Sequence, residues 1–218
     1  LKGGGQKAYE LNVTLFSMLA ESFGGDRTYG LERFVMSQAI AMSLEGVPAI
    51  YVQTIFATEN DQTGYEETGI PRRLNRKIWQ LEEAEERLSE EGIAKRAFDQ
   101  LRALMSIRMG QPAFHPNATQ YTLNLGPELL GVWRQSHLND QSIFCVFNLT
   151  DQVQDLDLSK INLIMTEGWT DLLSQQVIED FNGILALAPY QIVWISNIDG
   201  RNRIDSRLLQ RYRDAMPV

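Results

Sequence analysis

A short, continuous apolar run constrains the fold of this chain more than any other feature. Residues 47–52 read Val-Pro-Ala-Ile-Tyr-Val, which is rich in β-branched and aromatic residues. Such a run predicts a parallel strand that is buried on both faces, with the proline near its start, where no ladder donor is needed. A strand of this kind needs neighbours on both edges, and the residues before Tyr9 are Gly-rich and lack periodicity. We therefore expect that the chain enters a parallel sheet part-way, and that other strands of this sheet lie outside it.

Helical patterns surround the apolar run. Four segments carry apolar side chains at helical spacing and are expected to form helices: residues 10–22, 31–44, 78–92 and 93–109. The acidic side chains of the third segment are expected to face solvent. Between the run and this segment, residues 53–76 are polar and aperiodic, and they predict a long loop. Loops of this length inside a compact domain are typical of functional segments.

From Gln120 onward the periodicity changes to two. Seven short strand-like runs alternate with turn residues: 121–125, 129–134, 142–148, 153–158, 169–173, 183–187 and 190–196. Strands at this spacing predict an antiparallel β-sandwich of roughly 80 residues. We therefore expect an α/β part over residues 1–117 and an all-β sandwich over residues 118–199. Residues 200–218 form a basic, partly helical tail, which is either an interaction segment or a solvated end.

Composition argues against several classes of function. The chain has 218 residues and a formal charge of −8, and its basic residues cluster only at Arg72-Arg73 and in the tail, so we expect no nucleic-acid partner. No apolar run approaches the roughly 20 residues that cross a bilayer, so we expect no membrane partner. The single cysteine, Cys145, fits a buried position and a reducing, cytoplasmic location. His115 and His137 each lack a partner three or four residues away, so we expect no metal site and no cofactor.

Motifs around the apolar run resemble those of the alpha-amylase family, in its sucrose phosphorylase and glucosylglycerate phosphorylase-like branch. Residues 46–51 are similar to the eighth barrel strand of the family, which reads close to P-G-V-P-x-I-Y. Asn60-Asp61 and residues 68–76 resemble the N-D and G-R-x-I-N-R elements of the branch, and residues 9–14 resemble its Y-Q/E-x-N-x-T loop. With further likeness in residues 107–116 and 189–195, the resemblance covers nearly the whole chain.

The resemblance implies the C-terminal part of a TIM barrel, followed by the β-sandwich, from a retaining enzyme that transfers α-glucosyl groups. In the family an aspartate attacks the anomeric carbon and a glutamate protonates the leaving oxygen, with the two carboxyls about 5 Å apart. These residues follow the fourth and fifth barrel strands and a third carboxylate follows the seventh, so all three positions would precede Leu1. We therefore expect no catalytic residue in this chain and no activity of the chain alone.

Several partners and functions follow from this interpretation. The α-glucoside and phosphate would bind to a longer enzyme of which this chain is a part. A hydrolase rather than a phosphorylase as that longer enzyme is one alternative. A non-catalytic carbohydrate-binding or scaffold protein is another. A third alternative is a homo-oligomer that buries the exposed barrel edge.

Six residues are predicted to contact substrate, because loops that follow barrel strands open on the active face: Tyr9, Glu10, Asn12, Asp61, Arg72 and Arg76. Arg72 offers a rigid fork for phosphate or sugar hydroxyls, and the alternative is an ion pair with Glu66 or Glu67. Arg76 could instead brace the loop together with Asn75.

The remaining candidates also have structural alternatives. Tyr9 offers an aromatic face to a pyranose ring or packs in its loop. Asn12 holds the loop backbone or caps the following helix, and Asp61 accepts hydrogen bonds from sugar hydroxyls or forms a turn with Asn60. Glu10 stands where sucrose-specific members of the branch tend to carry Gln and where relatives that use acceptors such as glycerate carry Glu, which argues against sucrose.

Overall fold

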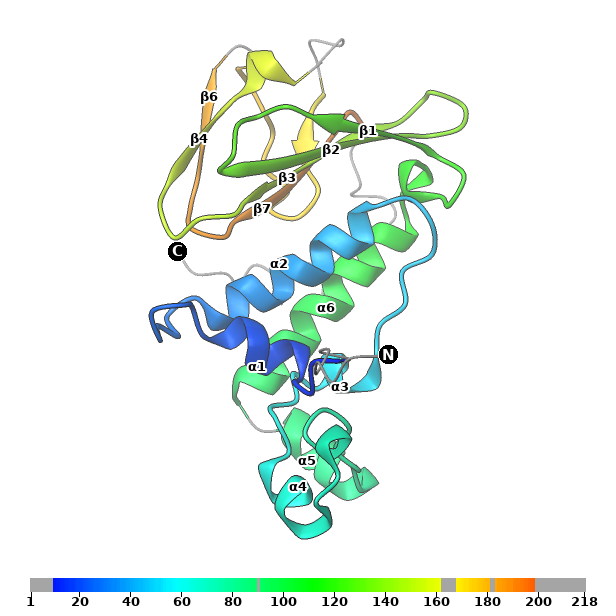
Figure 1. Ribbon diagram of the computed structural model, residues 1–218. Helices are drawn as coiled ribbons and strands as arrows, with labels where there is room; N and C mark the ends of the chain where they lie inside the picture. The colour runs from blue at the N-terminus through cyan, green and yellow to red at the C-terminus, as the bar shows by residue number, and fades with distance from the viewer. Residues whose placement is uncertain (1–9, 90, 162–167, 181–182, 199–218) are drawn as a thin grey trace, which may run out of the picture.

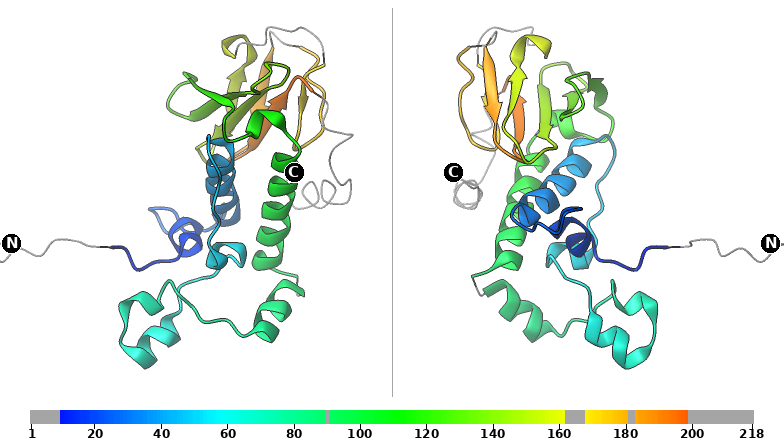
Figure 2. Two further views of the ribbon diagram at one scale, coloured as in Figure 1. Left: turned by 90° about the vertical axis from the view of Figure 1, so that its right-hand side faces the viewer. Right: turned by 60° about the vertical axis from the view of Figure 1, so that its left-hand side comes forward.

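The computed structural model describes residues 10–89, 91–161, 168–180 and 183–198. Figures 1 and 2 show a β part that stands on two long helices, α2 (Gly30–Ser43) and α6 (Ile93–Met109), which run side by side. The shorter helices lie away from the β part, with α4 (Gln62–Thr68) and α5 (Leu81–Ser89) at the far end of the molecule. None of the described helices is long and apolar enough to span a membrane.

Both long helices lie where the sequence predicts them. α6 ends at Gly110, and Pro112 then opens the 3-10 turn η2 (Pro112–Phe114), because proline cannot continue an α-helix. The first helix, α1, is shorter than the predicted segment 10–22 and spans Leu15–Ala20. It begins at Thr14, whose hydroxyl accepts a hydrogen bond from the N–H of Ser17 at 3.1 Å. Asn12 is therefore not the residue that caps this helix.

The predicted strand at residues 47–52 is wrong in its pairing and burial. The backbone of Tyr51 is extended, but residues 47–51 pair with no strand in the described part of the chain. The side chains of Val47 and Tyr51 are 80% and 54% exposed. A two-faced strand forms only when neighbours supply its hydrogen bonds, and the described residues supply none. The chain instead turns into the short helix α3 (Val52–Ile55).

The predicted long loop at residues 53–76 is also wrong, since it contains two short helices beyond α3. Asp61 caps α4 by accepting a hydrogen bond from the N–H of Gly64 at 3.0 Å. Gly69 ends the helix with a φ of +64°, a conformation that glycine adopts without strain. The 3-10 turn η1 (Pro71–Arg73) follows at once.

All seven predicted strands are present and pair antiparallel. The larger sheet has five strands in the order β1-β2-β3-β7-β5, and the smaller sheet pairs β4 with β6. The strands are β1 (Thr119–Leu123), β2 (Leu129–Gln135), β3 (Ser142–Asn148), β4 (Gln154–Asp157), β5 (Thr170–Asp171), β6 (Ile184–Leu187) and β7 (Ile192–Ser196), with the 3-10 turn η3 (Leu158–Lys160) after β4.

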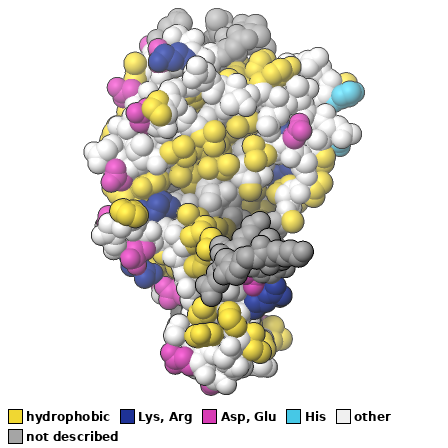
Figure 3. All heavy atoms as spheres, in the orientation of Figure 1, with side chains coloured by type: hydrophobic (Ala, Val, Ile, Leu, Met, Phe, Trp, Pro, Cys, Tyr) yellow, Lys and Arg dark blue, Asp and Glu magenta, His cyan; other side chains and the backbone are white. Residues whose placement is uncertain are grey.

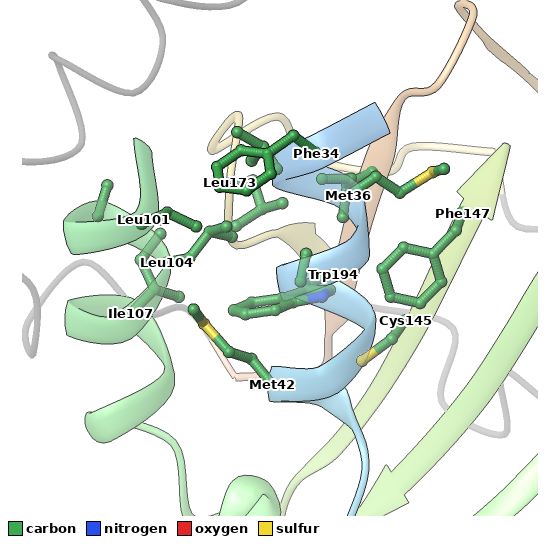
Figure 4. Packing of buried hydrophobic residues seen from close by; sticks show 14 of the residues in the cluster. Phe34, Met36, Met42, Leu101, Leu104, Ile107, Cys145, Phe147, Leu173 and Trp194 are labelled. Carbon is green, nitrogen blue, oxygen red and sulfur yellow. The ribbon is translucent and has the colours of Figure 1, made fainter. Parts of the chain in front are cut away.

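The five-stranded sheet is buried on both faces. On one face Phe144 and Val193 pack with Leu156 and Leu187 of the smaller sheet. On the other face Cys145, Phe147 and Trp194 pack against α2 and α6, which Figure 4 shows around the indole ring of Trp194. Helices and sheet therefore share one hydrophobic core. The division of the chain at residue 117 stays a prediction.

Burial also explains the single thiol. Cys145 is fully buried, and burial raises the pKa of its thiol to about 12. The thiol is therefore protonated at neutral pH, so Cys145 acts as a small apolar core residue, as the sequence indicated.

Two arginine side chains hold the turn that connects α2 to residues 47–51. The guanidinium of Arg134, which is fully buried on β2, donates to the carbonyl of Ser43 at 2.9 Å. Arg108 donates from α6 to the carbonyls of Met42 at 2.8 Å and Gly46 at 3.1 Å. Cations stabilise the carbonyl end of a helix. The start of the extended segment is thus fixed by both the long helix and the sheet.

Candidate functional site

Two predicted substrate-binding residues form an ion pair with each other. The Nε atom of Arg72 lies 2.7 Å from Oε1 of Glu10, and its Nη2 atom lies 3.1 Å from Oε2. Two parallel hydrogen bonds of this kind are the strongest geometry for a guanidinium and a carboxylate. The carboxylate that pairs with Arg72 is therefore that of Glu10, and not that of Glu66 or Glu67, which the sequence offered as alternatives. The pair joins residues 62 positions apart in the sequence, so it ties the first loop to the loop after residues 47–51.

The charges around Glu10 favour its ionised form. The hydrogen bond from Arg72 lowers the pKa of the Glu10 carboxyl, and attraction by Arg72 and Arg76 adds to this effect. Arg76 is exposed, and in the described residues its guanidinium donates no hydrogen bond and forms no ion pair. Its main-chain carbonyl accepts a hydrogen bond from Arg73 at 3.0 Å. Among the described residues, Arg72 is thus paired with a carboxylate, whereas Arg76 has no carboxylate partner within 4 Å.

Asp61 is held by its own neighbours. One carboxylate oxygen caps α4, and the other lies 2.9 Å from Nη2 of Arg73, with only 11% of the Asp61 side chain exposed. A methyl group at Gly64 would lie 2.4 Å from each of these two partner atoms, so a larger residue there would have to displace the ion pair. The structure therefore shows the turn role of Asp61. A contact with substrate stays a prediction.

Asn60 connects the two loops a second time. Its side-chain oxygen accepts a hydrogen bond from the N–H of Thr14 at 2.8 Å, and its own N–H donates to the hydroxyl of Ser17 at 2.9 Å. The side-chain oxygens of Asn12 and Asn75 are buried near these loops without a hydrogen bond from any described residue. The sequence pointed to Asn60 through the Asn60-Asp61 motif and its turn chemistry, but not to these hydrogen bonds with Thr14 and Ser17.

Tyr9 lies outside the described residues, so its role stays a prediction. The other five predicted residues lie on two loops that the structure brings together: Glu10, Asn12, Asp61, Arg72 and Arg76.

The base of the second loop is held by residues that the sequence analysis missed. The indole N–H of Trp79 donates to the side-chain oxygen of Gln53 at 2.9 Å, and the amide of Gln53 donates to the carbonyl of Lys77 at 2.7 Å. Arg87 donates from α5 to the carbonyls of Phe56 and Ala57, each at 3.2 Å. Only a three-dimensional structure reveals these contacts, because they join residues 24 to 31 positions apart.

A hollow lies away from these loops, beside η2 and the turn between β2 and β3. It has a volume of about 410 Å³ and is lined by Pro112, His115, Asn117, Ser136, His137, Leu138 and Asp140. The two histidines thus share one hollow, although they are distant in the sequence. Within the described residues, no group of three His, Cys, Asp or Glu side chains is placed to hold a metal ion.

Solved structures share this fold. An Anoxybacillus alpha-amylase superposes with a TM-score of 0.53 and 15% identity, covering 77% of this chain and 32% of that protein. A trehalose-6-phosphate hydrolase of Bacillus licheniformis superposes with a TM-score of 0.53 and 16% identity, covering 81% of this chain and 40% of that protein. At such identities the likeness shows the fold alone. The described residues form no closed barrel, but they match parts of proteins of this class.

Curated proteins are closer in sequence. The glucosylglycerate phosphorylase of Allomeiothermus silvanus is 38% identical over 196 residues, and that of Escherichia coli is 28% identical over 193 residues. The chain is thus similar in sequence to glucosylglycerate phosphorylases, and it shares the fold of a part of alpha-amylase family enzymes. Each alignment covers 88% of this chain but only 32% or 33% of the relative, so the chain spans about a third of their length and corresponds to their C-terminal part. No protein-family model matches the sequence.

Proposed function

We propose that this chain forms the C-terminal part of an α-glucoside phosphorylase, and that its two linked loops shape the acceptor side of the active site. The sequence likeness to glucosylglycerate phosphorylases supports the reaction class. The single observation that supports the site is the two-bonded ion pair between Glu10 and Arg72. It joins the two loops that the resemblance assigns to the region beside the scissile bond. In this proposal residues 47–51 complete a barrel with strands of a longer polypeptide.

The reaction follows the retaining pattern. The leaving group departs with a proton from the glutamate, the glucosyl unit is held by the aspartate, and a phosphate oxygen then replaces the aspartate oxygen at the anomeric carbon. Both carboxylates belong to the longer polypeptide. The residues of this chain would bind and orient the anionic phosphate and the leaving group. Such orientation lowers the entropic part of the activation barrier.

The ion pair suggests different roles for Arg72 and Arg76. Glu10 occupies the fork of Arg72 and fixes the direction of its guanidinium. Arg76 carries the uncommitted positive charge at the same edge, so it is the residue that we expect to attract phosphate or the carboxylate of a glycerate-like leaving group. A site with this spare cation fits an anionic leaving group better than fructose. This supports glucosylglycerate over sucrose.

The experiment expresses the proposed longer enzyme, in which an upstream segment precedes this chain. It measures the phosphate-dependent release of glucose 1-phosphate from glucosylglycerate and from sucrose. We expect phosphorolysis of glucosylglycerate by the longer protein and none by the chain alone. Arg76→Gln in the longer protein should raise KM for phosphate or for glucosylglycerate at least about tenfold, since a charged hydrogen bond is lost. Arg96→Gln, at an exposed position on α6, is the matched control.

Three outcomes would contradict the proposal. Phosphorolysis by the chain alone would place catalytic carboxylates within it. Hydrolysis without phosphate dependence by the longer protein would make that protein a hydrolase. Binding of glucosides to the chain alone, measured by calorimetry, together with an inactive longer protein, would support the carbohydrate-binding alternative.

A further inference from the structure

The outer edge of β1 is open. β1 lies first in the order of the five-stranded sheet, and it pairs only with β2 in the described part of the chain. Alternate residues of such an edge strand turn their main-chain N–H and C=O groups away from the sheet. Tyr121 at the centre of β1 is 45% exposed, and its neighbour Thr122 is exposed as well. This edge therefore offers unused hydrogen-bonding groups to another strand.

β1 lacks the features that usually protect an edge strand. Sheets are guarded by charged side chains, prolines or bulges on their edges. Residues 116–127 contain no Asp, Glu, Lys, Arg or His, and the two prolines of this stretch lie outside β1. The pairing of β1 with β2 runs without a bulge from Thr119 opposite Gln135 to Leu123 opposite Gly131. Five consecutive residues are thus regular, uncharged and accessible from one side.

β1 is also already fixed in the strand conformation. On one face the side chain of Gln120 accepts a hydrogen bond from the N–H of Glu45 at 2.7 Å. On the other face the ring of Tyr121 lies 4.7 Å from that of Trp133, which lies 5.6 Å from that of Phe144. A strand that is ordered before it pairs loses little conformational entropy on pairing.

We propose that β1 pairs in antiparallel fashion with β1 of a second copy of this chain across a twofold axis. With Tyr121 opposite itself, Thr119 faces Leu123 and Gln120 faces Thr122. Aromatic cross-strand pairs are favourable, and no like charges oppose each other. This matters because each copy carries a formal charge of −8. Figure 3 shows uncharged and hydrophobic side chains over the sheet and α2, with most charged side chains toward the margins.

The contact is small, so the association is weak. Two five-residue strands bury less than the roughly 1,200 Å² of a stable interface, and we expect a dissociation constant on the order of 100 μM. In the dimer the two five-stranded sheets form one continuous sheet.

The test is sedimentation velocity of this chain at concentrations below and above that value. Thr122→Lys places a charge on the open edge, while Thr122→Val keeps it uncharged and β-favouring. Val47→Lys tests the other exposed uncharged segment, where Val47 is 80% exposed. We expect the natural chain, T122V and V47K to associate alike, and T122K to weaken association at least about tenfold. Hydrogen exchange of the β1 amides should slow with concentration only in the associating proteins.

Two results would overturn the proposal. One is a chain that stays monomeric over the whole concentration range. The other is association that V47K abolishes and T122K leaves intact, since this would place the contact at residues 47–51. Circular dichroism checks that T122K is folded. Thr119→Lys, at another exposed position of β1, carries the same expectation if T122K is not folded.

Discussion

The β part, residues 119–196, and the loop part, residues 47–76, differ in how their main-chain hydrogen bonds are made. In the β part, ladders join seven strands, and β1 supplies an open edge. In the loop part, residues 47–51 have no ladder among the described residues, and the turns around them are held by side chains such as Arg108, Gln53 and Asn60. Main-chain ladders make a region cooperative, whereas separate side-chain contacts allow it to open piece by piece.

The shared core connects these two regions. Trp194 of β7 packs against both long helices, and its ring centroid lies 4.8 Å from that of Phe114 in η2. The sheet and helices should therefore unfold together, while residues 53–76 open locally. The following changes test this contrast, beginning with the one that should affect both regions.

Trp194→Ala is expected to have the largest effect. The side chain is fully buried, so its loss should lower the free energy of unfolding by about 3–5 kcal/mol. Urea unfolding followed by circular dichroism measures this. Leu138→Ala, at a position that is 79% exposed, is the control and should change stability by less than about 0.5 kcal/mol. Two separate transitions, of which Trp194→Ala shifts only one, would show that helices and sheet do not share a cooperative core.

The sequence predicted the long helices and the strands because their signals are local. α6 follows an apolar pattern that stops at Gly110. The strands of the β part follow a period of two and are separated by turn residues. Residues 47–52 were predicted as a strand on equally good local evidence. Their backbone is extended as far as Tyr51, but pairing depends on partners that no local pattern can supply.

The candidate site shows the same limit. The sequence identified Glu10 and Arg72, but it gave Arg72 only nearby acidic partners, because a contact between residues 62 positions apart follows from the fold. The helix α4 was missed although Asp61 and Gly69 are good helix boundaries, since its seven residues are too few and too polar to show a periodicity. Contacts between residues far apart in the sequence could thus not be predicted from local patterns, and the substrate-binding roles of these residues stay predictions.

Gly64→Ala should have a smaller effect that stays within the loop part. The added methyl group would collide with Arg73 and Asp61, so we expect a cost of about 1–3 kcal/mol and a displaced ion pair. Hydrogen exchange should then accelerate at the N–H of Gly69 and remain unchanged at the N–H of Asn148, which bonds within the β part. Gly92→Ala is a matched control, because no atom lies within 4 Å of the added group. Equal acceleration in both parts would argue against independent opening of the loop.

Arg72→Gln should have the smallest effect on stability and a clear effect on titration. The hydrogen bond from Arg72 lowers the pKa of Glu10, so the folded state favours the charged carboxylate. The pair therefore adds a small amount to the free energy of unfolding at neutral pH, and this amount is lost as the pH falls through the folded-state pKa of Glu10. Both side chains are partly exposed, so global stability should hardly change. Removing the cation should move the pKa of Glu10 upward, toward its ordinary value.

An NMR titration of the Glu10 carboxyl carbon measures this shift. Arg27→Gln is the control, because Arg27 pairs with Glu59 at 2.8 Å and should leave the titration of Glu10 unchanged. If Glu10 titrates alike in the natural chain and in Arg72→Gln, the two loops are not joined by this pair in solution. The arrangement that we propose for the acceptor side would then form only in the proposed longer enzyme. The contrast between a β part held by main-chain ladders and a loop part held by side chains would become sharper still.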